Sequence, residues 1–556
     1  MATLAAQASS LQETRHSLIA GRETPGRAGV RPALNPTTGA PFAQASLLDA
    51  EQAKEALAAA RSAFPGWSGL GFRARGRVLL RARDILASEG ESFARLIATE
   101  QGKPVAEALG VEVFPSLESL RHLALHAEET LRPEPLPSEV PLFAHKDERL
   151  VYEPYGVVLV ITPWNYPLFL ALAAVAAALV AGNAVVLKPA PATTLTGLRI
   201  GELWRQAGLP AGALSVLAVD DQVAAGLVED PRVGKIVFVG SAATGQKVMA
   251  AAARNLTPVL LELGGKDAAV VARDADLERA ARGIVWGAFM NTGQTCVSVE
   301  RVFVEEAVAE ALVAKIVEQT QRLRVGDPLQ AQTDLGPMTL ERQRALVEEH
   351  VADALARGAR ALTGGTRPPG PGFFYPPTVL TGVEASMRVM REESFGPLLP
   401  IMAVKDLDEA IGHANDSEYG LTASGWTRSR QVAERLGREL RAGVVTINDC
   451  VSSIGEPTAP YGGVGRSGIG RSHGALGLRE MAQPKYVTWD GTRRAPVWWF
   501  PYGDTFLRFM TAALPAIHGP GIRRRLSAQI RLLASGRFWR GVSLLGMLRR
   551  IDRLFS

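Results

Sequence analysis

The chain has few cysteines and no apolar run long enough to cross a membrane. Its 556 residues include two cysteines, Cys296 and Cys450, which is too few for a disulfide framework in a chain of this size. A count this low is typical of a reducing compartment, where a cysteine serves packing or reactivity. We therefore expect a cytoplasmic protein.

The longest apolar run covers residues 168–180 (LFLALAAVAAALV). At about 13 residues it is shorter than the roughly 20 that a bilayer-spanning helix needs, so it predicts a buried helix. Residues 1–34 lack the continuous apolar segment of a secretory signal and are expected to form a loose N-terminal extension.

Lysine is absent from the last 66 residues, whereas arginine is abundant there. Residues 491–556 contain twelve Arg and two acidic residues, a local charge of +10, while the whole chain carries +5. The first 490 residues are therefore mildly acidic, at −5. Because the positive charge is confined to a tail, it does not indicate a nucleic-acid partner for the whole protein.

The length predicts two or three domains. Helical periodicity covers residues 49–66 and 71–99, and after Pro154 short β-branched runs alternate with helical segments. This alternation predicts βαβ units and a parallel sheet, so the fold class is α/β. The strands are expected at 156–161, 184–188, 214–217 and 235–239, with helices at 168–181, 196–207 and 222–229. A second α/β region is expected to have helices at 275–290, 305–322 and 340–358 and strands at 301–304, 397–403 and 443–448.

Three residues are candidates for chemistry. Cys296 follows a glycine-containing turn (NTGQTC), although a lone buried cysteine more often only packs, as we expect of Cys450. Glu262, in LELGGK, follows an apolar run, and burial would raise its pKa towards the value of a general base. The alternative is a surface carboxylate. Asn165, in PWNYP, follows a strand, at the end of a sheet where ligands bind.

Seven motifs in order resemble the aldehyde dehydrogenase superfamily, from about Asn35 to Trp489. Within it the sequence is most similar to bacterial succinate-semialdehyde dehydrogenase-like members. The motifs are PWNYP (163–167), KPA (188–190), FVGSAATG (238–245), LELGGK (261–266), GQTC (293–296), EESFGP (392–397) and PYGGVGRSGIGRSHG (460–474).

The resemblance implies the aldehyde dehydrogenase fold in three parts. Residues 35–139 and 160–261 would form a Rossmann-like NAD(P)-binding domain, and residues 262–448 an α/β catalytic domain. Residues 140–159 and 449–490 would form a small β oligomerisation arm that also lines the active site. Residues 491–556 remain as a basic amphipathic tail.

The resemblance also assigns the catalytic roles. Cys296 would be the nucleophile, Asn165 and the Cys296 amide the oxyanion hole, and Glu262 the base that activates water. A thiolate adds to the aldehyde, the oxyanion needs preorganised donors, and the resulting thioester is hydrolysed. No metal is required. His122 and His126 have zinc-ligand spacing but no third ligand nearby.

NAD or NADP is the implied cofactor. Lys188 would bind the adenosine ribose, and many NAD-specific members carry a glutamate three positions later, where this chain has Pro191. We therefore expect NADP to be accepted, because no carboxylate at that position repels a 2′-phosphate. The other cofactor-binding residues implied are Trp164, Gly240, Ser241, Gly245, Glu393 and Phe395.

The expected substrate is an uncharged, apolar aldehyde. Semialdehyde enzymes of the family grip the distal carboxylate with arginines, and the corresponding positions hold Met290 and Ala173. The remaining expected lining is Tyr166, Phe169, Leu170 and Val297. Two alternatives stay open: a succinate-semialdehyde dehydrogenase whose arginine comes from another loop, and a non-catalytic membrane-surface binding protein on the same scaffold.

Two further partners are expected from the C-terminal region. Residues 485–489 (KYVTW) resemble the strand by which family members pair, so a homodimer or homotetramer is expected. Residues 522–555 predict one or two helices, broken near Gly536, that combine arginine with Leu, Ile, Phe and Trp. That composition is typical of a helix lying peripherally on an anionic membrane. The alternative is packing on the protein's own acidic body or on a neighbouring subunit.

Overall fold

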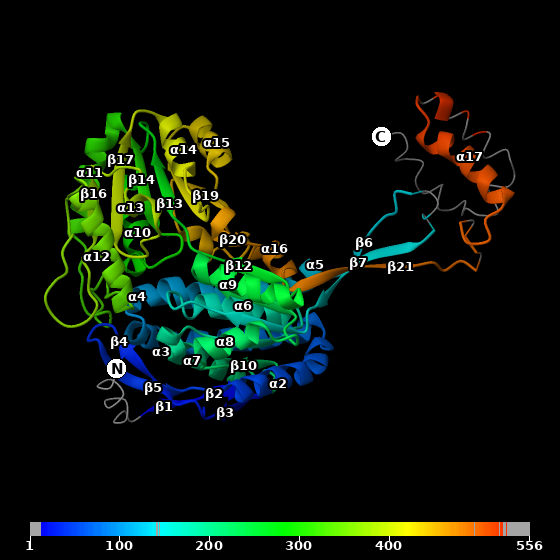
Figure 1. Cartoon of the computed structure of the whole chain (residues 1–556), viewed down its shortest axis with the longest axis horizontal. Coiled ribbons are helices and arrows are strands. Elements are labelled where there is room, and N and C mark those ends of the chain that lie inside the picture. The colour runs from blue at the N-terminus through cyan, green and yellow to red at the C-terminus, as the bar shows by residue number, and fades with distance from the viewer. Residues whose placement is uncertain are drawn as a thin grey trace. The chain divides into compact units, whose positions relative to one another are not determined.

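A computed structural model describes residues 13–140, 143, 145–493, 495, 496, 498–521, 523–525, 527 and 530. The chain divides into two compact units. The first contains residues up to 130 together with 154–483, and the second contains residues 131–153 together with those from 484 onward. Figure 1 labels the elements of both.

The first unit contains an eight-stranded sheet built around parallel strands. Its central order is β12-β11-β8-β9-β10, and helices connect successive strands. The strands are β8 (Val157–Ile161), β9 (Ala184–Lys188), β10 (Leu214–Val216), β11 (Lys235–Val239) and β12 (Val259–Glu262), and the helices are α6 (Phe169–Val180), α7 (Thr194–Gln206), α8 (Asp221–Val228) and α9 (Ala242–Ala252). All of these except β12 and α9, for which no bounds were predicted, match the predicted elements within two residues.

The edges of this sheet come from distant parts of the chain. β20 (Gly468–Ile469) pairs antiparallel with β12, while β2 (Ser17–Ile19) and β3 (Arg22–Thr24) extend the sheet beyond β10. The expectation of a loose extension is therefore wrong for residues 14–34. Leu18 and Ile19 are buried, and the Ala218 amide donates to the Ser17 hydroxyl (2.9 Å).

A small three-stranded sheet completes the N-terminal region. It pairs β1 (Thr14–Arg15), β5 (Ala40–Ser46) and β4 (Val30–Asn35) in that order. Next come α2 (Ala50–Ser68) and α3 (Phe72–Glu100), and Asp49 caps α2 in a capping box with Gln52. Residues 1–12 lie outside the described residues.

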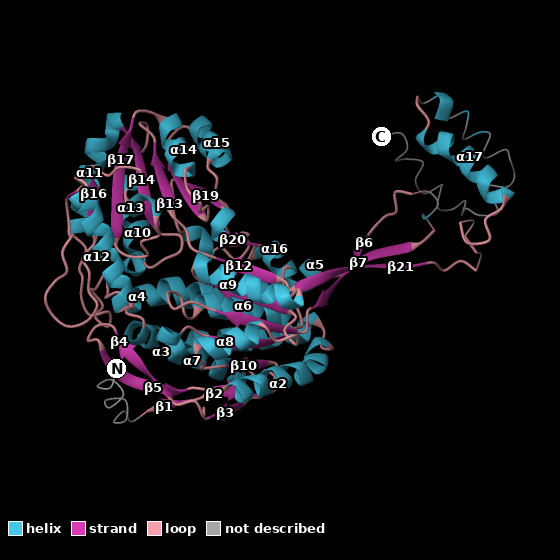
Figure 2. Cartoon of the chain, in the orientation of Figure 1, coloured by secondary structure: helices cyan, strands magenta, loops and turns pink. Residues whose placement is uncertain are grey.

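A seven-stranded sheet forms the rest of the first unit. Its order is β15-β16-β17-β14-β13-β18-β19, and the strands are parallel except β15 at the edge. Alternate residues of β13 face opposite helical layers, which Figure 2 shows on the two sides of the sheet. The strands are β13 (Asp267–Val271), β14 (Val299–Glu305), β15 (Arg360–Ala361), β16 (Thr378–Thr381), β17 (Leu398–Val404), β18 (Thr422–Trp426) and β19 (Val444–Ile447). The helices are α10 (Leu277–Phe289), α11 (Glu306–Gln321), α12 (Glu341–Ala356), α13 (Arg388–Arg391), α14 (Leu407–Asn415) and α15 (Arg430–Glu439).

The apolar run at 168–180 forms α6, and ten of its twelve residues are buried. The prediction of a buried helix is thus confirmed. α6 contacts β8 and β9 of the eight-stranded sheet. Among the described helices, none has the length and apolar character needed to cross a membrane.

The second unit contains a three-stranded sheet and a helix. The sheet pairs β21 (Ala482–Trp489), β7 (Asp147–Pro154) and β6 (Glu134–Pro135), and the helix is α17 (Asp504–His518). α17 was not predicted from the sequence; it begins after Gly503 and contains Pro515 near its end. The helices predicted between 522 and 555 lie outside the described residues, apart from 523–525, 527 and 530.

Candidate active site

Cys296 follows a turn with an unusual backbone. α10 ends at Phe289, and Asn291, Thr292 and Gly293 then adopt φ values of 52°, 55° and 70°. The left-handed region is costly for β-branched residues such as threonine. At Gly293 a side chain is also sterically excluded, because a Cβ would lie 2.1 Å from the carbonyl oxygen of Gly396. The turn leaves the Cys296 side chain half-buried.

Buried side-chain amides hold this turn in place. The Gln294 amide donates to the Asn291 carbonyl (3.0 Å) and accepts from the Thr339 backbone (2.9 Å). The Gln101 amide donates to the Asn291 side chain (2.9 Å). Because every bond is buried, the network can stabilise a conformation that the backbone alone disfavours. Sequence motifs gave no signal for Gln101.

Asn165 lies between β8 and α6, beside the cysteine turn. Its side-chain amide donates one N–H to the Gln294 carbonyl (3.1 Å), which leaves the other N–H available to a ligand. The backbone carbonyl of Asn165 accepts hydrogen bonds from Lys103 Nζ (3.0 Å) and from the side-chain amide of Asn291 (2.9 Å). The structure thus places Asn165 against the turn that leads to Cys296, two residues before the cysteine.

Lys103 also belongs to a buried ion pair that the sequence analysis missed. Its ammonium lies 2.7 Å from the carboxylate of Glu112, and both side chains are fully buried. Glu112 accepts hydrogen bonds from the amides of Leu168 (3.0 Å) and Phe169 (2.9 Å) at the start of α6. A carboxylate is stabilised at a helix N-terminus, so the pair fixes the segment that carries Asn165.

The Cys296 thiol lies among groups that mostly oppose its ionisation. Burial, together with the charges of Glu262, Asp267 and Glu393, raises the pKa of the thiol to about 12. One group acts in the opposite direction: the hydroxyl of Tyr461, 3.3 Å from Sγ, lowers the pKa. The other cysteine, Cys450, is buried and its thiol donates to the Gly283 carbonyl (3.1 Å). The packing role predicted for it is confirmed.

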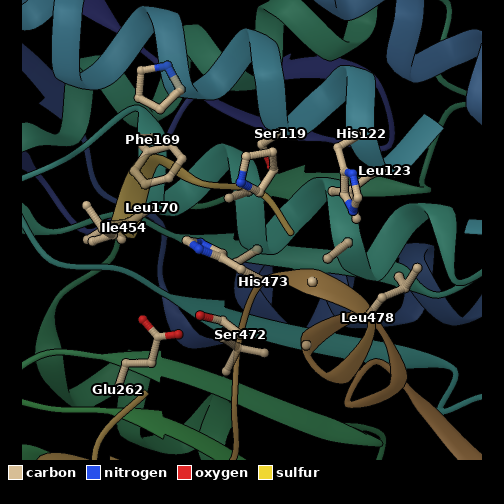
Figure 3. A pocket seen from close by; sticks show the side chains of 18 of the residues that line it. Ser119, His122, Leu123, Phe169, Leu170, Glu262, Ile454, Ser472, His473 and Leu478 are labelled. Carbon is tan, nitrogen blue, oxygen red and sulfur yellow. The ribbon is translucent and has the colours of Figure 1, made fainter. Parts of the chain in front are cut away.

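Glu262 is the last residue of β12, opposite Gly468 of β20. Burial raises the pKa of this carboxyl to about 7, and the Ser472 hydroxyl opposes the rise. Figure 3 shows the carboxyl pointing towards Ser472. A carboxyl that titrates near neutral pH suits a general base.

A cavity in the first unit extends from Glu262 past His473 to His122 (Figure 3). Among the described residues that line it, none is Lys or Arg. Burial lowers the pKa of His473 to about 4, so its ring is neutral. The other lining residues are mostly apolar or small, and they include Phe169, Leu170, Ala173, Ala174, Ala177, Val237, Val239, Leu260, Ile454, Leu478 and Met481.

The predicted substrate lining is only partly at this cavity. Phe169, Leu170 and Ala173 line it. The remaining three residues, Tyr166, Met290 and Val297, are buried in one hydrophobic cluster with these, against which Cys296 packs. The sequence analysis did not assign His122 and His473 to the cavity, although His473 lies within a quoted motif.

The residues predicted to bind a dinucleotide offer groups suited to binding one. Ser241 caps α9 by accepting from the Thr244 amide (3.3 Å) and is exposed, which leaves a free helix N-terminus suited to phosphate. Glu393 lies against Gly264 and accepts from the Gly265 amide (3.2 Å). At Gly264 a Cβ would lie 2.2 Å from that carboxyl.

Two aromatic rings and two closely packed glycines belong to the same predicted dinucleotide site. The Trp164 and Phe395 rings meet edge to face, with centroids 5.4 Å apart. A Cβ at Gly245 would lie 2.5 Å from the Leu263 side chain, and one at Gly240 would lie 2.7 Å from the Phe238 ring. These two glycines therefore let α9 and its preceding loop pack closely.

Lys188, the residue expected to bind the adenosine ribose, has a carboxylate nearby. Lys188 ends β9 with its side chain buried, and its Nζ lies 3.5 Å from the carboxylate of Asp221, which is 91% exposed. Position 191 itself holds a proline, as expected, but Asp221, the first residue of α8, brings a carboxylate to the same lysine.

Comparison with known proteins matches residues 25–487 to the aldehyde dehydrogenase family. A Methylomonas protein named 4,4'-diapolycopene aldehyde oxidase is 39% identical over 469 residues, covering 84% of this chain and 87% of its own. The succinate-semialdehyde dehydrogenase [NADP(+)] of Escherichia coli (strain K12) is 35% identical over 458 residues, covering 82% and 93%.

A solved structure shows the same fold. The NAD-dependent aldehyde dehydrogenase of Sinorhizobium meliloti aligns with a TM-score of 0.85 and 34% identity, over 88% of this chain and 97% of that one. The predicted fold class is thus confirmed. The family match over most of the chain and the motifs gathered around Cys296 lead to one conclusion: the chain belongs to the aldehyde dehydrogenase family and is an oxidoreductase that acts on aldehydes.

Proposed function

We propose that the protein oxidises an uncharged, apolar aldehyde to its carboxylic acid through a thioester on Cys296, with NAD or NADP as the oxidant. The observation that supports this proposal best is the juxtaposition of Cys296 and Glu262 with Asn165, which contacts the turn before Cys296. Glu262 lines a mostly apolar cavity in which none of the described lining residues is Lys or Arg. The related enzymes named NAD- or NADP-dependent support the cofactor.

Three residues carry out the chemistry in this proposal. The Cys296 thiol loses its proton to solvent, and the thiolate then bonds to the aldehyde carbon. The electron pair of the C=O bond moves to oxygen, where the free Asn165 N–H and the Cys296 amide stabilise it. One oxyanion donor is worth about 2.7–4 kcal/mol in transition-state stabilisation. Glu262 next takes a proton from the water that attacks the thioester, and sulfur leaves as thiolate.

The bound dinucleotide would accept the hydride that converts the adduct into the thioester. Lys188 and Asp221 would face its adenosine ribose, and Ser241 with Gly240 and Gly245 its phosphates. Glu393, Phe395 and Trp164 would position the nicotinamide half. In domain terms, residues 35–139 with 160–261 bind the cofactor and residues 262–448 supply the nucleophile.

Substrate choice follows from the cavity. An aldehyde with a distal carboxylate would leave that charge without a cationic partner, and burying an unpaired charge is strongly unfavourable. We therefore place succinate semialdehyde second, although a relative bears that name. The test is a kcat/KM screen of hexanal, decanal and succinate semialdehyde with both cofactors. Decanal should exceed succinate semialdehyde at least a hundredfold, about 2.7 kcal/mol. A preference for succinate semialdehyde would overturn the substrate proposal.

We also propose that the chain assembles as a homodimer or homotetramer through β21. Seven of the eight residues of this strand are exposed, among them Tyr486, Val487 and Trp489. An exposed strand with apolar side chains is suited to pairing with another copy. Sedimentation at micromolar concentration should therefore show a dimer or tetramer, and a monomer would contradict this.

A peripheral membrane contact is the proposed role of the C-terminal region. Trp499, Phe500 and Leu507 are 62%, 82% and 66% exposed, and Arg508, which directly follows Leu507, is exposed as well. Exposed aromatics beside arginines favour an anionic lipid surface. Co-sedimentation with anionic vesicles should occur for the full chain and not for a truncation ending at Asp490. Equal behaviour of the two proteins would contradict this role.

A further inference from the structure

The hydroxyl of Tyr461 contacts the reacting atom of the proposed nucleophile, although nothing in the motif assigns it a function. Its oxygen lies 3.3 Å from Cys296 Sγ, and the two residues are 165 positions apart. Sulfur accepts weakly, so hydrogen bonds to it are longer than those to oxygen. The contact therefore qualifies as a hydrogen bond between the two side chains.

Tyr461 is held so that this contact is a fixed feature of the site. Its side chain is 2% exposed. Its backbone amide and carbonyl both pair with Ser472 at 2.8 Å, and its ring stacks on His473 with centroids 5.7 Å apart. A buried ring held on two sides cannot easily turn its hydroxyl away from the thiol.

The direction of the hydrogen bond follows from the surroundings. Burial and the charges of Cys296, Glu262 and Asp267 keep the pKa of the phenol well above its usual range, so it remains protonated. Once Cys296 ionises, sulfur has no proton to give and Tyr461 must be the donor. The nearby carboxyl groups of Glu262, Asp267 and Glu393 all disfavour the thiolate.

We propose that Tyr461 is a catalytic residue whose hydroxyl donates a hydrogen bond to the Cys296 thiolate. The proposal rests on Cys296 being the nucleophile. The hydrogen bond would act twice, first on the attacking thiolate and later on the sulfur that leaves when the thioester is hydrolysed. No proton is transferred from Tyr461 in either step, since the thiol proton goes to solvent.

The alternative is a purely structural role, in which Tyr461 only packs in the hydrophobic cluster around Cys296. Phenylalanine would fill the same space without the hydroxyl, so Tyr461→Phe separates the two roles. The readout is the rate at which iodoacetamide alkylates Cys296 in the protein without substrate or cofactor. Peptide mass spectrometry distinguishes Cys296 from the buried Cys450.

Tyr461→Phe should slow alkylation at pH 8 by threefold to tenfold. Loss of the hydrogen bond raises the thiol pKa by about one unit, which lowers the thiolate fraction tenfold. A thiolate of higher pKa is intrinsically more nucleophilic, and this recovers up to about threefold. The matched control is Tyr375→Phe, which removes the hydroxyl of another buried tyrosine, one that packs in a different hydrophobic cluster from that of Cys296. Its alkylation rate should stay within twofold of wild type.

A second variant tests whether a folding defect, and not the lost hydrogen bond, explains slow alkylation. Replacing Tyr461 alone by 3-fluorotyrosine keeps the ring and makes the hydroxyl a stronger donor, so alkylation should become faster than in wild type. Slower alkylation of Tyr461→Phe together with faster alkylation of the fluorinated protein would support the proposal. Rates within twofold of wild type in both would overturn it. Because no aldehyde is present, failure of the proposed oxidation would appear separately, as absent turnover.

Discussion

The pH dependence of turnover reports directly on Glu262. Burial raises its carboxyl pKa to about 7, and it can act as a base only when ionised. At pH 6 roughly 9% of the molecules would carry the carboxylate, and at pH 8 roughly 91%. Where hydrolysis of the thioester limits the rate, kcat should therefore rise about tenfold between pH 6 and 8 and level off above.

Stopped-flow measurement of NAD(P)H separates the steps. The initial burst reports thioester formation, while the steady-state rate reports its hydrolysis. Glu262→Gln should retain a burst and lose at least a hundredfold in steady-state rate at every pH. A steady-state rate that is flat between pH 6 and 8, while a burst shows that hydrolysis still limits turnover, would refute the assignment of the base.

The remaining predictions concern residues that shape the site. Gly293→Ala places a Cβ 2.1 Å from the Gly396 carbonyl oxygen at φ 70°, so the NAD(P)H burst should be lost and the unfolding temperature lowered. Gly437→Ala is the matched control: Gly437 is an exposed residue of α15 with open space around its Cβ position, so the burst and the unfolding temperature should both stay as in wild type. Asp221→Asn removes the carboxylate 3.5 Å from Lys188, so kcat/KM for NADP relative to NAD should rise at least about fivefold, and an unchanged ratio would exclude Asp221 from cofactor selection. Lys103→Met leaves Glu112 buried without its cation, which should cost about 3–5 kcal/mol in stability, and an unchanged urea midpoint would contradict that.

Much of the fold could be predicted because buried parallel strands have a strong local signal. β9 and β11 were predicted to the residue, since each contains four consecutive apolar residues, two or three of them β-branched, between helices. The strands before residue 35 could not be predicted. β2 has three residues, and its burial depends on β10, about 200 positions later.

The site was predicted where it follows motifs and missed where it depends on tertiary contact. Cys296 and Asn165 lie in recognisable segments, and in the structure Asn165 contacts the turn before Cys296. Lys103, Asp221 and Tyr461 contact partners that the sequence does not place beside them. A lysine between two helices, as Lys103 is, is normally expected at the surface, and only the packing of Glu112 against the start of α6 explains its burial.

Trapping the thioester tests the central claim most directly. Glu262→Gln incubated with decanal and NAD(P), quenched in acid and digested, should yield the Cys296 peptide heavier by one decanoyl group, in nearly stoichiometric amount. The same treatment of Cys296→Ser or of protein without cofactor should yield none. If the Cys296 peptide stays unmodified while NAD(P)H is still produced, oxidation does not proceed through a thioester on Cys296.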